Sequence, residues 1–292
     1  MQQLASIGIL FFATALVAAE ARLHVVTSFL PLYCWTVNVA GEFAEVDNLL
    51  PPRSEPHEYA FTPGDARKLG RADLIVINGA GLETWLPKFL RGSPSSRDRV
   101  AIISAGLDAQ LITAEHPDAR DPACANPHVW LDPLIAAHGV SNILAALQRT
   151  DPVHSTNYAR QAQAYVARLQ QLDTDIRQSL AGATHRAIVT YHDAFPYFAR
   201  RYGLEIAGVV EQVPDVNPTP KYLSQLGRTM RERNIDVIFI GQNSASRLAH
   251  RIAADLRVEL VELDTLESGP PDPSAYEERM RHNAVVLQKH LN

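Results

Sequence analysis

Three histidines and one aspartate occupy positions where side chains can bind a metal ion. His57 lies in a proline-rich loop, and His128 lies within the segment Asn-Pro-His-Val-Trp-Leu-Asp-Pro. His192 and Asp264 each directly follow an apolar run that is typical of a buried strand. Three neutral imidazoles and one carboxylate suit the tetrahedral coordination of Zn²⁺. The residue types therefore predict a zinc site made of His57, His128, His192 and Asp264.

The segment around His128 is the strongest of the four signals. Prolines on both sides restrict the backbone and hold the imidazole in a loop before a helix. A fixed imidazole on a rigid scaffold serves a metal site or a catalytic site. Taken alone, the segment is equally compatible with an ordinary helix start that happens to contain a histidine.

Each of the other candidates also has a structural alternative. His57 could be an ordinary loop residue beside Glu58, and His192 a core residue at a strand end. Asp264 could form a turn or cap a helix. Glu211, Glu262 and a water molecule are the alternatives to Asp264 as fourth ligand.

Short apolar strands alternate with amphipathic helices along the chain, which is the pattern of a parallel α/β sheet. Thr62-Pro63 and the Ser-x-x-Glu pattern at Ser274 predict capped helix starts. The expected strands span 23–28, 44–50, 74–78, 100–104, 187–191, 206–210, 237–241 and 259–263.

A long amphipathic stripe in the middle of the chain predicts a helix of more than six turns. Its apolar positions recur every three or four residues: they are Tyr158, Ala162, Tyr165, Leu169, Leu172, Ile176 and Leu180. We expect two α/β lobes, each with a central, mostly parallel sheet, joined by this one long central helix. The expected N-terminal lobe is 22–150, the linking helix 151–182 and the C-terminal lobe 183–292. A core helix within one large domain is the alternative.

This order of elements predicts where the four candidates meet. In open parallel sheets, ligands bind beyond the carboxyl ends of the strands. All four candidates fit that edge, two from each half of the chain. We therefore expect a site shared between the lobes.

The first residues indicate where the protein acts, and the net charge limits the kind of partner it binds. Residues 1–21 contain an apolar run followed by small residues, which predicts a secretory signal peptide and a periplasmic protein. No cysteine follows the run, so a lipid anchor is not expected. Removal of Glu20 changes the formal net charge from −5 to −4. This acidic balance argues against a nucleic-acid partner.

Two cysteines, Cys34 and Cys124, are the only ones in the chain. An even count in an exported protein predicts one disulfide bond, which would close a loop of about 90 residues. It would also anchor the segment that presents His128. Two buried thiols are the alternative.

The motifs resemble those of the periplasmic zinc- and manganese-binding proteins of ABC importers. The matching segments are Pro-His-Glu-Tyr at His57, the proline-flanked segment at His128, Tyr-His-Asp-Ala-Phe-Pro-Tyr-Phe at His192 and Leu-Asp-Thr-Leu at Asp264. The resemblance covers essentially the whole mature chain. It implies a two-lobed fold with a linking helix, and zinc bound between the lobes as the transported ligand.

The resemblance also implies a membrane permease as partner and a monomeric protein, while delivery by a metallochaperone stays open. Manganese-carrying relatives usually have a carboxylate in place of His192, so the imidazole favours zinc. The loop 107–126 has only His116 where zinc-binding relatives often have many histidines, which makes a second metal site doubtful. The cysteine pair also differs from the disulfide position expected in relatives, which lies in the second lobe.

A manganese-binding importer component, a zinc-dependent hydrolase and a surface adhesin are the alternative functions. A hydrolase of the zincin type would show His-Glu-x-x-His on a helix. His57-Glu58 begins that pattern, but position 61 is a phenylalanine. We therefore expect a binding protein and not an enzyme.

Overall fold

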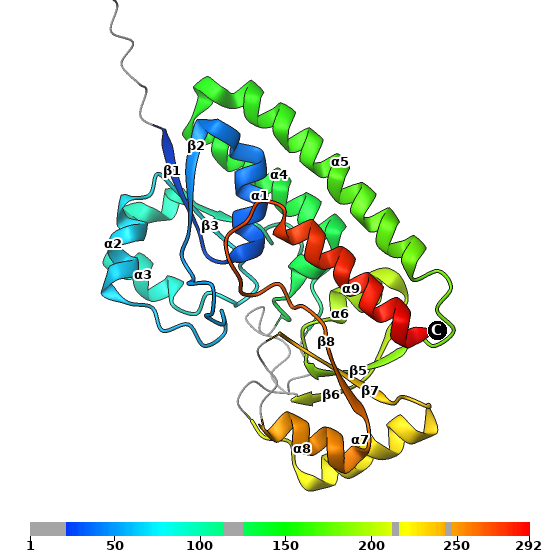
Figure 1. Cartoon of the computed structure of the whole chain (residues 1–292). Coiled ribbons are helices and arrows are strands. Elements are labelled where there is room, and N and C mark those ends of the chain that lie inside the picture. The colour runs from blue at the N-terminus through cyan, green and yellow to red at the C-terminus, as the bar shows by residue number, and fades with distance from the viewer. Residues whose placement is uncertain (1–21, 114–124, 212–215, 243–246) are drawn as a thin grey trace, which may run out of the picture.

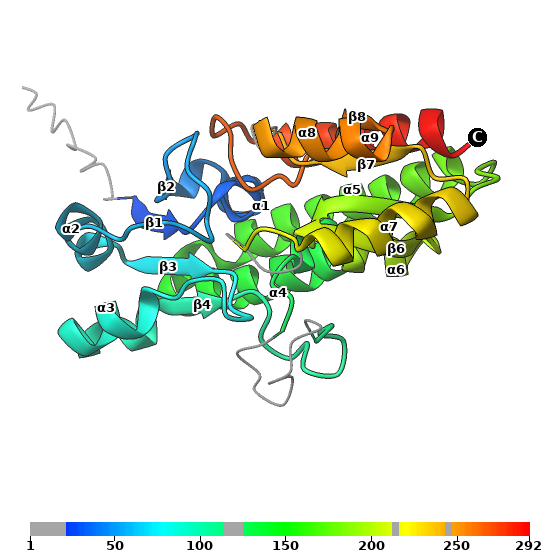
Figure 2. The same ribbon diagram turned by 90° about the horizontal axis from the view of Figure 1, so that it is seen from below.

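The computed structural model describes residues 22–113, 125–211, 216–242 and 247–292. These residues form two four-stranded sheets, and every strand pair within them is parallel. The two sheets lie in opposite halves of the molecule (Figure 2). The expected two-lobed α/β fold is thereby confirmed, whereas the signal peptide lies outside the described residues.

The first sheet has the strand order β2-β1-β3-β4. Its strands are β1 (Leu23–Thr27), β2 (Ala44–Asn48), β3 (Leu74–Ile77) and β4 (Val100–Ile102). The helices of this half are α1 (Leu30–Ala40), α2 (Pro63–Arg71), α3 (Leu86–Gly92) and α4 (Pro133–Thr150). All four residues of β3 are buried, as expected for a strand that is covered on both faces.

The second sheet repeats this arrangement with the order β6-β5-β7-β8. Its strands are β5 (Ala187–His192), β6 (Glu205–Glu211), β7 (Val237–Ile240) and β8 (Glu259–Glu262). Its helices are α6 (Pro196–Tyr202), α7 (Pro220–Glu232), α8 (Arg247–Leu256) and α9 (Ala275–Leu291). Short 3₁₀ helices occur at Gly41–Phe43, Pro94–Arg99, Val129–Leu131 and Pro152–His154.

The long helix α5 (Ser155–Ser179) connects the two halves, and α9 lies beside it (Figure 1). All seven positions of the predicted apolar stripe are buried. They face α1, α4 and α9, so α5 is covered by helices from both ends of the chain. Because α9 also contacts α1, the C-terminal helix returns to the first half. The lobe boundaries at 150/151 and 182/183 remain a prediction.

Cys34 is a buried free thiol on α1. Its Sγ donates to the carbonyl of Asp272 at 3.1 Å, and burial raises its pKa to about 12. Its predicted disulfide partner, Cys124, lies outside the described residues. Among the helices that are described, none is both long enough and apolar enough to cross a membrane.

Candidate metal centre

The three predicted histidines converge, and a glutamate completes the group. One potential ligand atom from each of His57, His128, His192 and Glu267 lies within 4.8 Å of all the others. His128 Nε2 is central: it is 3.1 Å from His57 Nε2, 3.2 Å from His192 Nε2 and 3.1 Å from Glu267 Oε1. His57 Nε2 is 3.0 Å from the same Glu267 oxygen.

The fold explains why these four residues meet. His192 is the last residue of β5, and His57 lies in the loop that follows β2. His128 immediately precedes the 3₁₀ helix Val129–Leu131, and Glu267 lies in the segment after β8. Each residue therefore comes from a loop or a strand end, as expected for a binding site of parallel sheets.

Two successive hydrogen bonds lead from Trp130, beside His128, through Thr265 to Glu267. Trp130 Nε1 donates to the carbonyl of Thr265 at 2.8 Å, and the Thr265 hydroxyl donates to Glu267 Oε2 at 2.7 Å. Tyr276 Oη on α9 donates to the carbonyl of Trp130 at 2.7 Å. One Glu267 oxygen is thus held by protein, while the other faces the imidazoles.

The group is largely enclosed, and its less buried members are His57 and His192. The side chain of His128 is 2% exposed and that of Glu267 is 6% exposed, whereas His57 is 22% exposed. A small ion fits such an enclosed group of side chains.

Burial keeps two of the imidazoles neutral. It lowers the pKa of His128 to about 3 and also lowers the pKa of His192. A neutral imidazole offers a nitrogen lone pair, which is the form that binds a metal.

The glutamate and the third histidine form the charged part of the group. Burial alone would raise the pKa of Glu267, but the neighbouring imidazoles of His128 and His57 hold it well below its usual range. Burial alone would lower the pKa of His57, but Glu267, followed by Glu55 and Glu58, raises it overall. The site therefore combines a carboxylate with imidazoles. A metal cation can bind the nitrogen lone pairs of these imidazoles in place of a proton.

Asp264, the predicted fourth ligand, lies outside this group and faces the polypeptide. Its Oδ1 accepts from the backbone of Leu266 at 2.8 Å, and its Oδ2 is 3.4 Å from Arg279 Nη1. The backbone of Asp264 exchanges two hydrogen bonds with the side chain of Asn283 on α9. Asp264 shapes the turn that brings Glu267, three residues later, beside the histidines.

The other carboxylates that were considered are also not part of the group. Glu211 pairs in register with His192 across the β5–β6 ladder and is half-buried. Glu262 is exposed at the end of β8. Glu267 was not among the residues singled out from the sequence. One sequence feature could have directed attention to the residues after Asp264. An aspartate side chain often accepts a hydrogen bond from the backbone N–H two residues later, and the resulting turn changes the direction of the chain just before Glu267.

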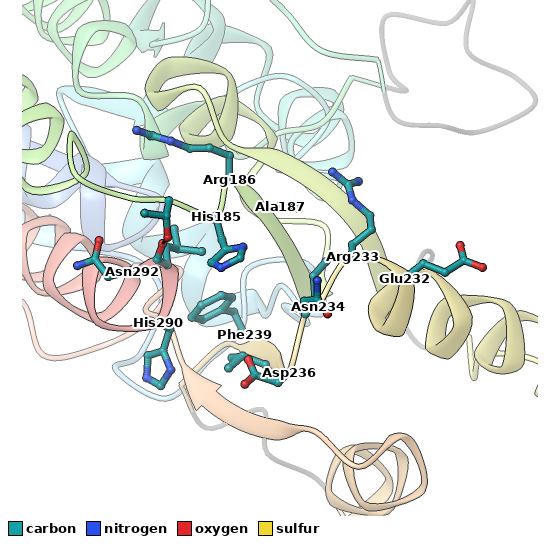
Figure 3. Close-up of a pocket in the computed structure, with 14 residues that line it drawn as sticks. His185, Arg186, Ala187, Glu232, Arg233, Asn234, Asp236, Phe239, His290 and Asn292 are labelled. Atoms are coloured by element: carbon teal, nitrogen blue, oxygen red, sulfur yellow. Dashed lines mark hydrogen bonds between the residues drawn. The ribbon is translucent and has the colours of Figure 1, made fainter.

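A separate cavity of about 500 Å³ lies at the opposite edge of the second sheet (Figure 3). It opens beside Ala187 and Val237, the first residues of β5 and β7, and reaches the C-terminal Asn292. His185 and His290 line it, but neither belongs to the four-residue group. The cavity and the candidate metal centre are thus independent features.

Comparison with known protein families gives an extensive match. A family model for ZnuA, described as the periplasmic component A of a zinc-uptake complex, matches residues 25–290. The high-affinity zinc uptake system protein ZnuA of Bacillus subtilis is 32% identical over 252 residues, covering 84% of this chain and 79% of that protein. The zinc-binding lipoprotein AdcA of Streptococcus pneumoniae is 31% identical over 258 residues, covering 86% of this chain. The chain spans about half the length of AdcA, 51%.

Solved structures show the same two-lobed fold. The Zn(II)-bound form of an AdcAII variant from Streptococcus pneumoniae has a TM-score of 0.83 at 27% identity, covering 93% of this chain and 99% of that one. The solute-binding protein FpvC of Pseudomonas aeruginosa in complex with Mn²⁺ has a TM-score of 0.81 at 27% identity. That alignment covers 93% of this chain and 98% of FpvC.

Proposed function

Because the chain belongs to the family of periplasmic zinc-uptake components, we propose that it captures Zn²⁺ between its two lobes and delivers the ion to the permease of an ABC importer. The proposed ligands are Nε2 of His57, His128 and His192 and a carboxylate oxygen of Glu267. The observation that carries this assignment is the convergence of these four atoms within 4.8 Å of one another.

Three imidazole nitrogens and one carboxylate oxygen favour zinc over the harder manganese ion. A nitrogen donor at His192 is the feature that separates the two cases, since oxygen donors suit Mn²⁺ better. FpvC has been solved with Mn²⁺ and with Ni²⁺, so the choice of metal has to be measured for this chain.

Binding and transport also explain the donor set better than catalysis does. Four protein ligands fill a tetrahedral zinc site, whereas a catalytic zinc keeps one position for water or substrate. A bound zinc therefore has no free position at which to activate water. We infer a solute-binding protein and not a hydrolase.

The site of action follows from the proposed role. We infer that residues 1–21 direct export and that the mature chain starts at Arg22, on the periplasmic side of the permease. N-terminal sequencing of the chain recovered from a periplasmic fraction tests this point. A chain that retains Met1 would contradict it.

The decisive experiment is a titration of metal-free residues 22–292 against a competing chelator. Zn²⁺, Mn²⁺ and Ni²⁺ are compared at equal concentrations. We expect one tightly bound zinc per chain and weaker binding of manganese. Failure to bind zinc tightly would overturn the proposal. Tight binding of manganese together with weak binding of zinc would instead assign the protein to manganese uptake.

Carboxylate variants identify the fourth ligand. Replacing Glu267 by Gln should weaken zinc binding by more than about 100-fold, because even changes to residues that only support a ligand cost 10- to 100-fold. Glu211→Gln and Glu262→Gln remove the other candidate carboxylates and should leave the affinity nearly unchanged. If one of these two variants weakens binding more than Glu267→Gln, the assignment of Glu267 is wrong.

A further inference from the structure

Asn126 lies two residues before His128 and is buried, with 3% of its surface exposed. Its backbone N–H donates to the carbonyl of Ile112 at 2.8 Å, and its carbonyl accepts from Tyr197 Oη at 2.7 Å. Tyr197 belongs to α6, in the half of the molecule that carries His192. The main chain of Asn126 is therefore held by contacts from both halves.

The side-chain amide of Asn126 is equally constrained. Its Oδ1 is 3.1 Å from the backbone nitrogen of His128 and 3.0 Å from His128 Nδ1. Its Nδ2 is 2.8 Å from the carbonyl of Asp193 and 3.2 Å from Asp193 Oδ2. A backbone N–H can only donate and a carbonyl can only accept, so the amide satisfies its partners in this one orientation.

The orientation of this amide determines the tautomer of His128. Because Asn126 Oδ1 is an acceptor, the His128 Nδ1 that faces it must carry the proton. The lone pair of the neutral ring is then on Nε2, which faces His57, His192 and Glu267. Hydrogen bonding of the second ring nitrogen is the usual way in which a protein orients a metal-binding histidine.

The same side chain also links two ligand segments across the lobes. Asn126 contacts His128 through its oxygen, and through its nitrogen it contacts Asp193, the residue after His192. A relative movement of the two segments would break at least one of these hydrogen bonds. The amide thus couples the tautomer of one proposed ligand to the position of another.

We propose that Asn126 is a positioning residue for zinc, which fixes His128 in the Nδ1–H tautomer and holds the His128 and His192 segments together. The inference rests on the proposed zinc-binding function. Asn126 itself does not bind the metal in this arrangement, and its effect is transmitted through the two histidine segments.

Two substitutions separate the two parts of this role. Asn126→Ala removes both the acceptor and the donor. Asn126→Asp keeps an acceptor oxygen for His128 but loses the N–H donor and places a carboxylate against Asp193. The tautomers of the histidine rings are read from ¹⁵N–¹H NMR spectra of the metal-free chain. Zinc affinity is measured against a chelator, and zinc release by transfer to excess chelator.

We expect Asn126→Ala to bind zinc about 10- to 100-fold more weakly and to show a mixture of His128 tautomers. Asn126→Asp should retain the Nδ1–H tautomer and an affinity closer to that of the unsubstituted chain, but should release zinc faster. The matched control is Asn142→Ala. Its amide also donates to backbone carbonyls, those of Ile102, Ile103 and Ala105, but it contacts His138 and not the proposed ligands.

Three results would overturn the proposal. They are an unchanged tautomer and affinity in Asn126→Ala, an equal loss of affinity in Asn142→Ala, and loss of the Nδ1–H tautomer in a folded Asn126→Asp. If the unsubstituted chain itself fails to bind zinc, the proposed function fails instead. The NMR comparison in the metal-free chain still decides whether Asn126 sets the tautomer.

Discussion

At the scale of single residues, Asp264 and Glu267 show how a turn assigns different roles to two carboxylates. Asp264 lies two residues after the end of β8, where a side chain can reach a ligand or the following backbone. Here it bonds to Leu266, which has a φ of +61°, a conformation that non-glycine residues adopt rarely. This turn orients Glu267 toward the histidines.

This difference predicts separate consequences for the two side chains. Asp264→Ala should lower the free energy of unfolding by about 1–3 kcal/mol, because the buried N–H of Leu266 loses its partner. The metal-free protein is unfolded in urea, and zinc stoichiometry is measured in parallel. We expect one zinc still to bind. Loss of zinc binding with unchanged unfolding would restore Asp264 as the ligand.

Proton competition should make zinc binding depend on pH. Glu267 and neighbouring acidic residues raise the pKa of His57 above its ordinary value, whereas burial lowers the pKa of His128 to about 3. As the pH falls through the pKa of His57, this ring gains a proton that zinc must displace. We expect the affinity to fall about tenfold per pH unit below that point, with one proton released per zinc.

Calorimetry in buffers of different ionisation enthalpy measures this released proton. The variant His57→Gln cannot take up the proton. It should bind zinc more weakly, but its zinc affinity should depend little on pH between about 6 and 8, the range in which histidine titrates. An equally steep pH dependence in His57→Gln would assign the proton to another group.

The sequence predicted three of the four clustered residues for a physical reason that can be stated. His57, His128 and His192 follow strands or precede a helix, so the order of elements already placed them at one edge. Glu267 belongs to a segment without regular structure, whose path depends on Asn283 and Arg279 reaching back from α9. Such contacts between distant residues have no local signal in the sequence.

At the scale of elements, capping patterns in the sequence predicted a helix start correctly where that start depends on adjacent residues alone. Thr62 caps α2 and forms a reciprocal capping box with Asp65, as predicted for its N-terminus. The capping box predicted at Ser274 was wrong, because the Ser274 hydroxyl donates to Asp272 instead of capping α9. Asp272 also accepts from the backbone of Ser274, and this alternative turn competes with the cap.

An ion pair between α5 and α6 predicts a pH-dependent contribution to stability. Asp173 accepts from Arg201 Nε at 2.8 Å and from Nη2 at 2.6 Å. Burial alone would raise the pKa of Asp173, but these hydrogen bonds hold it below its usual range. The pair therefore stabilises the fold above the unfolded pKa of about 3.9, and the gain disappears as the pH falls through the lower folded value.

Asp173→Asn should cost about 2 kcal/mol of unfolding free energy at pH 7 and much less at pH 3. Urea unfolding of the metal-free chain at both pH values measures the difference. Asp175→Asn is the matched control on the same helix, since its ion pair with Arg281 is longer, at 3.3 Å, and more exposed. Its removal should cost less than about 0.5 kcal/mol. Equal costs in the two variants would contradict the assigned role of Asp173.

At the scale of the whole molecule, one hydrophobic cluster crosses from the first lobe to the second. It contains Val25 of β1, Leu169 of α5, Phe239 of β7 and Leu287 of α9. Two smaller clusters fill the far sides of the two sheets. Because protein interiors are closely packed, a large hinge movement would have to separate the shared cluster. The lobes are thus expected to move little against each other when zinc binds.

This rigidity predicts a local response to zinc. The radius of gyration from X-ray scattering should change by less than about 1 Å between the metal-free and zinc-bound chain, as is common for preorganised sites. Hydrogen exchange should slow at 55–58, 126–128, 192–193 and 264–267, whose residues form or support the group, and should stay unchanged in the middle of α5. The matched control is zinc added to Glu267→Gln, in which these changes should be lost at the same zinc concentration. A change of several ångströms, or altered protection along α5, would instead mean that the shared cluster separates, and that zinc uptake proceeds by closure of whole lobes.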